Sequence, residues 1–151
     1  VISGPRTGSK TLDMSIPNEL PPQVPGIVGK VARVESLRPN ALIPIINGGT
    51  FKCWMETLVD CDSVIESCDD GRPAVIGQKD RMYIAGWGNQ EALKRILKDA
   101  CIYQNITTIE LPDCVRVRET FSHRFWFNYS DSETRIGATS LRPSGVLWEK
   151  L

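Results

Sequence analysis

Short β-type runs separated by turn residues fill most of the first 110 residues. Apolar and polar residues alternate from 31 to 36, and an apolar run from 41 to 46 ends at Asn47-Gly48-Gly49. Runs at 50–58 and 63–67 follow, and Asp69-Asp70-Gly71 closes the second with residues that favour a turn. The runs at 73–76 and 81–86 are typical of strands in a sheet covered on both faces. This part of the chain is therefore predicted to be β-rich.

One segment, between Asn89 and about Tyr103, has the periodicity of a helix. Its apolar positions are Leu93, Ile96, Leu97, Ala100 and Cys101. Charged residues occupy the opposite side, which predicts an amphipathic helix. Asn89 is suited to cap its first turn, and the carboxylate of Glu91 suits the positive end of the helix dipole.

The stretch from residue 4 to residue 25 predicts a long loop. It is dense in Gly, Ser, Asn and Pro, and prolines deny the backbone regular hydrogen bonds. The prolines at its end are Pro17, Pro21, Pro22 and Pro25. Long loops in compact domains are usually functional or packed against a neighbour, so we expect a partner surface here.

The pattern changes at Leu111-Pro112, after which no helical period appears. Every second residue from Val115 to Tyr129 is mostly apolar, which predicts a strand region with one apolar face. Shorter β-type runs follow at 134–139 and 146–148. We therefore predict two domains, at residues 1–110 and 111–151, the second a small antiparallel sheet.

Composition narrows the classes of function. The 18 basic and 18 acidic residues balance, and the basic ones are scattered, which argues against a nucleic-acid partner. No apolar run approaches the roughly 20 residues that a membrane helix needs. The five cysteines include no C-x-x-C pair and no usual zinc spacing. We expect free thiols, a cytoplasmic location, and neither a metal nor a cofactor.

The sequence offers no complete set of catalytic side chains. His123 is the one histidine, it lies in a predicted strand, and no G-x-S-x-G motif supplies a nucleophile. The glutamates are scattered without a pattern that would pair two of them for sugar hydrolysis. Aromatic rings at Trp54, Trp87 and Trp126 are candidates for stacking on sugars or for lining an interface, beside an ordinary core role.

Four blocks, taken in order, resemble the C-terminal part of glycoside hydrolase family 42 β-galactosidases. The first is V-I-S-G-P-R-T-G-S-K at 1–10, followed by P-G at 25–26 and V-G-K-V-A-R-V-E-S-L at 28–37. G-R-P-A-V-I at 71–76 then pairs with R-M-Y-I-A-G at 81–86. The last block contains L-P at 111–112, V-R-V-R at 115–118 and F-W-F-N-Y-S-D at 125–131.

The resemblance implies an incomplete α/β layer of the amidotransferase or flavodoxin type that serves trimerisation, followed by a small antiparallel β domain. It also implies that catalysis by two glutamates takes place in a TIM barrel outside this chain. The one Asn-Glu pair here, Asn18-Glu19, lies in the proline-rich loop, so no catalytic role is transferred to it. Arg6, in the first matching block, joins the three tryptophans as a candidate for sugar contact or interface formation.

The predicted function is therefore non-catalytic: an oligomerisation or structural region of a β-galactosidase-like glycoside hydrolase. An open sheet edge would pair with another copy or with the catalytic domain, since exposed strand edges recruit partners. Two alternatives remain open at this stage. One is a stand-alone carbohydrate-binding β module that uses its exposed tryptophans, and the other is an enzyme whose site involves His123 or the thiols.

Overall fold

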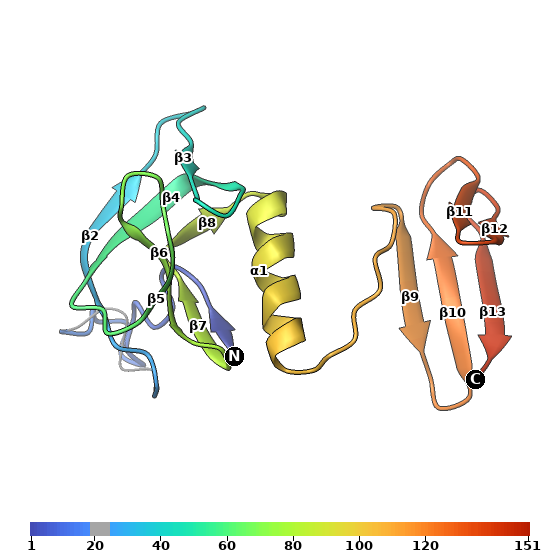
Figure 1. Cartoon of the computed structure of the whole chain (residues 1–151), viewed down its shortest axis with the longest axis horizontal. Helices are drawn as coiled ribbons and strands as arrows, with labels where there is room; N and C mark the ends of the chain where they lie inside the picture. Colours follow the sequence, from blue (N-terminus) through green and yellow to red (C-terminus); the bar gives the residue numbers. More distant parts are fainter. Residues whose placement is uncertain (19–24) are drawn as a thin grey trace. The chain divides into compact units, whose positions relative to one another are not determined.

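A computed structural model describes residues 1–18 and 25–151, which form two compact units. Unit 1 comprises Val1–Thr107 and unit 2 comprises Thr108–Leu151, and the predicted boundary between residues 110 and 111 lies close to this division (Figure 1). Glu19, Pro21 and Pro22 of the predicted loop lie outside the described residues.

Unit 1 contains two small sheets and one helix. The first sheet has the order β1-β7-β6-β5, in which β1 pairs with β7 in parallel and the other pairs are antiparallel. The second has the order β2-β4-β3, and β8 also pairs with β4. The strands are β1 (Ile2–Ser3), β2 (Lys30–Ser36), β3 (Ile43–Pro44), β4 (Thr50–Val59), β5 (Val64–Ser67), β6 (Pro73–Gln78), β7 (Arg81–Ile84) and β8 (Gly86–Gly88).

The run predicted as a single strand at 81–86 serves both sheets. Residues 81–84 pair with β6 in the first sheet, whereas Gly86 and Gly88 pair with β4 in the second. A Cβ atom at Gly86 would lie 2.6 Å from the Phe51 ring, so only glycine allows this close approach. The prediction of one uninterrupted strand is therefore wrong, because the chain changes sheets at Ala85.

The core of unit 1 lies where the sheets and the helix meet. The continuous burial of β6 and β7 confirms the prediction that these strands are covered on both faces. Ten buried residues form the main cluster: Ile45, Phe51, Met55, Cys68, Ala74, Val75, Met82, Ile84, Ala92 and Ile96. The predicted strand at 41–46 is shorter than expected, since only Ile43–Pro44 makes ladder pairs.

Helix α1 (Gln90–Tyr103) begins and ends where the sequence predicted, with Asn89 as its N-cap. The side that faces the sheets differs from the prediction, because Ala92 and Ile96 are buried while Leu93 and Leu97 remain 39% and 51% exposed. The small Ala92 side chain lets the helix approach the Gly49 turn so closely that a Cβ atom at Gly49 would clash with it.

Unit 2 is a three-stranded antiparallel sheet, in the order β13-β10-β9, with a separate two-stranded hairpin, β11-β12. Its strands are β9 (Val115–Glu119), β10 (His123–Asn128), β11 (Thr134–Ile136), β12 (Thr139–Leu141) and β13 (Val146–Lys150). The prediction of one shared face from Val115 to Tyr129 is wrong. The turn between β9 and β10 places Phe125 opposite Arg118, so the odd residues of the two strands lie on opposite faces.

The described chain is thus β-rich with one helix and several antiparallel pairs, as the hydrophobic pattern predicted. None of its described helices is long and apolar enough to span a membrane.

Candidate functional site

The Glu56 carboxylate is the centre of a polar cluster inside unit 1. Glu56 lies on β4 and is only 3% exposed. Its Oε2 accepts a hydrogen bond from the Tyr83 hydroxyl at 2.5 Å. Its Oε1 accepts from the backbone N–H of Arg6 at 2.9 Å and from the Trp54 indole N–H at 3.3 Å. Both carboxylate oxygens are therefore occupied by donors from the same chain.

Two of the four sequence-predicted candidates, Arg6 and Trp54, come together at this cluster. The Arg6 guanidinium lies 5.4 Å from the centre of the Trp54 ring, a cation–π distance. The Arg6 backbone is in the left-handed region, with φ of 68°, and this turn directs its N–H at Glu56. The loop of the first family-like block is thus fastened to β4 by both its backbone and its side chain.

A pocket of about 190 Å³ opens beside the cluster. It is lined by the loop residues Arg6, Thr7, Ser9, Lys10 and Ile16, the strand residues Val31, Val34 and Trp54, and the cluster residues Glu56 and Tyr83. Burial, followed by the hydrogen bond to Glu56, raises the pKa of the Tyr83 hydroxyl far above its ordinary value. Tyr83 is thus held as a neutral donor, which suits an anchor and not a proton shuttle.

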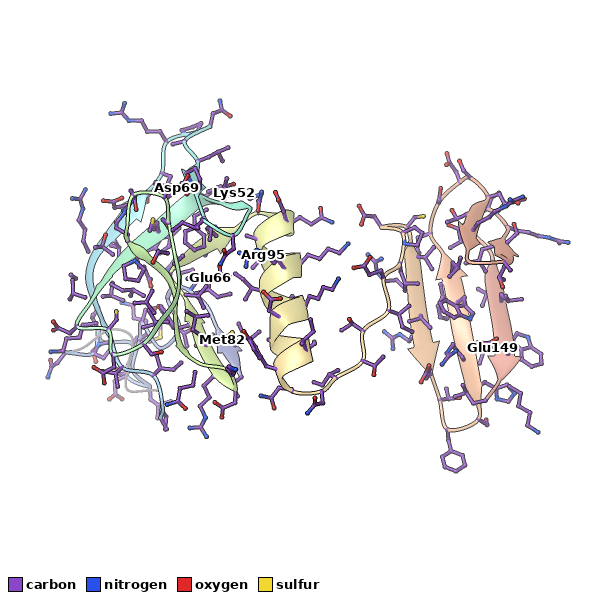
Figure 2. The ribbon with its side chains drawn as sticks, viewed as in Figure 1. Lys52, Glu66, Asp69, Met82, Arg95 and Glu149 are labelled. Atoms are coloured by element: carbon purple, nitrogen blue, oxygen red, sulfur yellow. The ribbon has the colours of Figure 1, made fainter. Side chains whose placement is uncertain are left out.

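A second polar contact joins α1 to β5. Arg95 donates through both terminal nitrogens to the two oxygens of Glu66, and the Nη2–Oε2 distance is 2.8 Å (Figure 2). Arg95 also donates to the carbonyl of Gly48 and lies 3.7 Å from the Asp99 carboxylate. The hydrogen bond to Glu66, together with the nearby charges of Glu66 and Asp99, raises the pKa of the Arg95 guanidinium. Glu66 and Asp99 line one small pocket, but the arginine between them engages both.

The Asn128 amide has the same anchoring role in unit 2. Asn128 is 3% exposed, and its Nδ2 donates to the carbonyls of Ser132 at 2.8 Å and Arg142 at 3.0 Å. Its Oδ1 accepts from the Ser130 N–H at 3.0 Å. One side chain at the end of β10 therefore fixes the segments on both sides of the β11-β12 hairpin.

The other two candidates lie apart from the Glu56 cluster. Trp87 on β8 is 49% exposed and borders a mostly apolar pocket with Pro5 and Leu93. Trp126 belongs to unit 2, where the Arg124 guanidinium lies 5.8 Å from its ring centre. The prediction that Arg6 and the three tryptophans contact a sugar or an interface stays a prediction for each of them.

The groups considered for nucleophilic or metal chemistry are not assembled into a site. His123 Nδ1 contacts the neighbouring Ser122 hydroxyl at 2.7 Å, and its ring packs against Trp148. No carboxylate orients the imidazole within residues 1–18 and 25–151. The five cysteines are free thiols. In the same ranges, no three potential metal ligands cluster.

Sequence reasoning missed Glu56, Tyr83 and Asn128 as structural anchors. The available signal for Glu56 was a carboxylate beside Met55 in a predicted strand. A single sequence does not pair such a residue with a tyrosine 27 positions away, because strand register is set by the whole sheet.

Comparisons with known proteins find similarity to part of the sequence and structure of β-galactosidases. No protein-family model matches the chain. It is 32% identical over 148 residues to a β-galactosidase from Thermus thermophilus, which covers 92% of this chain and 22% of that protein. The crystal structure of a β-galactosidase from the psychrophilic Marinomonas ef1 matches 99% of this chain and 25% of that chain, with 28% identity and a TM-score of 0.87.

A GH42 β-galactosidase from G. stearothermophilus shares the fold over 83% of this chain, with a TM-score of 0.60 and 12% identity. By fold, then, the chain matches part of the structures of these proteins. By sequence and structure together it is related to part of a β-galactosidase, as the ordered blocks indicated. The chain spans only about a quarter of the length of these relatives.

Proposed function

We propose that this chain is a non-catalytic, structural region of a β-galactosidase-like glycoside hydrolase and corresponds to the C-terminal part of such an enzyme. The catalytic glutamates are supplied by a barrel outside the 151 residues. The observation that carries this proposal is that each carboxylate oxygen of Glu56 and Glu66 already accepts a hydrogen bond from the chain itself.

Retaining glycosidases need two carboxyl groups about 5 Å apart with room for a sugar between them, and inverting enzymes need a wider gap. Glu56 is the one carboxylate that lines its pocket. The pocket with two carboxylates, Glu66 and Asp99, holds the Arg95 guanidinium against both. Neither arrangement leaves a free acid and a free base facing a substrate, which supports a structural role.

The finer assignment is that unit 1 belongs to the incomplete amidotransferase-like α/β layer and serves trimerisation, while unit 2 is the terminal β domain. One parallel pair, β1 with β7, and helix α1 support an α/β origin. Strand β1 stands at the end of its sheet, so its outer edge is open to a further strand in the part of the chain that the structure describes. We propose that a second copy or the catalytic domain covers this edge.

The cytoplasmic location is likewise a proposal. It is supported by the thiols of all five cysteines, which stay unpaired in this structure, because disulfides form mainly in oxidising compartments.

Activity measurements on two proteins test the catalytic assignment. The 151-residue chain alone should not hydrolyse a nitrophenyl β-galactoside, whereas the complete product of the gene that encodes it should. Turnover by the chain alone that is lost in Glu56→Gln or Glu66→Gln would overturn the proposal, and Glu91→Gln on the exposed helix surface is the matched control.

Light scattering after size-exclusion chromatography tests the oligomerisation role on the same two samples. We expect the complete gene product to be an oligomer. A complete product that is monomeric at all concentrations tested would refute this part of the proposal while leaving the structural, non-catalytic role intact.

A further inference from the structure

One face of the unit 2 sheet is aromatic and cationic. The strand register places His123, Phe125 and Phe127 of β10 on the same side as Val146 and Trp148 of β13. The rings of Phe125, Phe127 and Tyr129 form a row with centroids 6.3–6.4 Å apart. Trp148 is 61% exposed, Tyr129 72% and Val146 58%. We call this side of the sheet the aromatic face.

Three cations border the aromatic face. Arg118 and Arg116 on β9 lie opposite Phe125 and Phe127, and Lys150 on β13 lies opposite His123. Arg116 donates only to the backbone carbonyls of Asp113 and Val115. Within residues 1–18 and 25–151, no carboxylate lies within ion-pair distance of Arg116, Arg118 or Lys150.

On the opposite face of the same sheet, the one cation among the described residues is paired with two carboxylates. There Arg124 pairs with Glu119 at 2.5 Å and with Glu149 at 3.2 Å. The sheet thus concentrates its unpaired positive charge on the one side that also carries most of its rings. Arginine and aromatic residues are the side chains most enriched at the centres of protein interfaces.

Unit 2 also has too few buried residues to account for so many aromatic rings on one face of its sheet. Val115, Asn128 and Leu141 are its fully buried residues. A three-stranded sheet with an apolar face needs a second layer, because a single layer leaves its apolar side chains in water. The aromatic face is the surface on which such a layer would lie.

From these observations we propose that the aromatic face is the docking surface for a partly apolar, carboxylate-bearing protein surface supplied by the catalytic part of a β-galactosidase-like polypeptide. This identification of the partner rests on the proposed function. Two copies that packed through this same face would bring three unpaired cations against three others, which opposes a symmetric dimer. A neutral galactoside offers no charge to these cations and covers far less than three strands.

Radical footprinting with mass spectrometry tests the proposal on the chain alone and on the complete gene product. We expect oxidation of Trp148 and Tyr129 to fall at least fivefold in the complete product. Phe121, fully exposed in the turn between β9 and β10, is the internal control and should react equally in both samples. Equal oxidation of Trp148 and Tyr129 in both samples would overturn the proposal.

Charge reversal tests the complementarity. Arg116→Glu with Arg118→Glu should restore oxidation of Trp148 in the complete product, whereas Arg135→Glu with Arg142→Glu changes the same charge at exposed positions outside the three-stranded sheet and should not. Equal effects of the two pairs would contradict an acidic partner surface. If the variants do not fold, the comparison of the chain alone with the complete product, both without substitutions, decides the test.

The other occupants give distinct results. Protection in the chain alone that increases with its concentration would identify a second copy, and protection by added lactose would identify a sugar; either outcome overturns the proposal. Activity of the complete product on β-galactosides is measured in parallel. Activity without protection refutes only the docking surface, whereas protection without activity removes the proposed function and the named partner.

Discussion

Each of the three buried polar side chains, Glu56, Glu66 and Asn128, anchors segments that are distant in sequence. A buried polar group is tolerated only when its hydrogen-bonding capacity is used, because desolvation is otherwise uncompensated. Glu56 fastens the N-terminal loop, Glu66 fastens the helix, and Asn128 fastens the ends of a hairpin. Their polar atoms therefore connect segments of the chain, and each carboxylate oxygen and amide atom already has at least one partner within it.

Substitutions of Tyr83 and Glu56 should have coupled effects on the free energy of unfolding, because the two side chains share a hydrogen bond. Tyr83→Phe leaves one buried carboxylate oxygen without its donor, so we expect the free energy of unfolding to fall by about 2 kcal/mol. Glu56→Gln should cost a similar amount, and the double variant less than the sum, with a coupling of about 1 kcal/mol. Urea unfolding followed by circular dichroism measures these values.

Tyr103→Phe is the matched control, because Tyr103 is 45% exposed at the end of α1. It should change the free energy of unfolding by less than about 0.5 kcal/mol. Strict additivity of Tyr83→Phe and Glu56→Gln would show that the two side chains do not interact in solution.

The buried Cys68 thiol should make the fold sensitive to alkali. Burial, and after it the Asp70 carboxylate, raises the pKa of Cys68 from 9.0 to about 11. A raised pKa in the folded state favours the neutral thiol. The contribution of this thiol to the free energy of unfolding is therefore complete below pH 9 and is lost as the pH rises towards 11. Between pH 8 and 10.5, the wild type should lose about 2 kcal/mol more than Cys68→Ala.

Urea unfolding at several pH values, with Cys53→Ala as the exposed control, measures this difference. Both variants keep Tyr83, whose raised pKa acts in the same direction, so the comparison isolates the thiol. Parallel pH profiles for the wild type and Cys68→Ala would contradict the prediction.

At the residue scale, the sequence pointed to Arg6 and Trp54 but not to the reason for their proximity. Their positions are 48 residues apart, and the connection runs through Glu56, which one sequence presents as another strand carboxylate. Burial of a charged residue depends on tertiary contacts, so local patterns do not reveal it.

At the element scale, the pair of Glu66 and Arg95 holds α1 against β5. Glu66→Leu should lower the free energy of unfolding by about 3 kcal/mol, because it removes the bidentate partner of a mostly buried guanidinium and leaves only the half-exposed Asp99 carboxylate nearby. Adding Arg95→Met should recover most of that loss, since an apolar pair of similar size removes the uncompensated charge. Chemical denaturation of the two variants and the wild type gives the comparison; a double variant less stable than Glu66→Leu would be the opposite result.

The N-cap of α1 should contribute more than an ordinary cap. Asn89 Oδ1 accepts from Ala92 N–H at 2.9 Å and from Thr50 N–H at 3.2 Å, so it joins the helix to the start of β4. Asn89→Ala should cost about 2 kcal/mol, at the upper end for caps, whereas Asn89→Asp keeps an acceptor and should cost under about 1 kcal/mol. Hydrogen exchange in the first turn of α1 and in β4 reports both effects, and a loss of protection confined to the helix would argue against the joint role.

The elements themselves were largely predictable because their periodicities are local. The helix bounds, the Asn89 cap and the buried runs of β6 and β7 follow directly from residue patterns. The prediction of a shared face from Val115 to Tyr129 failed because of the turn between β9 and β10. Glu119 pairs with Arg124, so four residues separate these paired positions. An even number places odd-numbered residues of one strand opposite even-numbered residues of the next, and the alternation along the sequence then no longer marks a single face. Likewise, nothing local shows that the chain changes sheets between β7 and β8.

At the scale of the whole molecule, the two units differ in how much they bury. Unit 1 contains a main core cluster of ten buried residues and a second cluster of four. Unit 2 is small. In small units, the free energy gained by burying apolar surface exceeds the cost in conformational entropy only slightly. Covering its aromatic face by a partner would add the layer that the isolated sheet lacks.

Asn128→Ala should therefore unfold unit 2 selectively. The substitution leaves the Ser130 N–H and the carbonyls of Ser132 and Arg142 without their partner, a loss of about 2–3 kcal/mol. A unit with so few buried residues has a small free energy of unfolding, so this loss should unfold it. Unit 1 makes none of these hydrogen bonds and should keep its stability. Hydrogen exchange with mass spectrometry should show β9 to β13 exchanging at least tenfold faster while β4, β6 and β7 keep their protection. Thr139→Ala, on the exposed β12, is the control and should leave both units unchanged; faster exchange throughout both units would mean that they unfold as one cooperative structure.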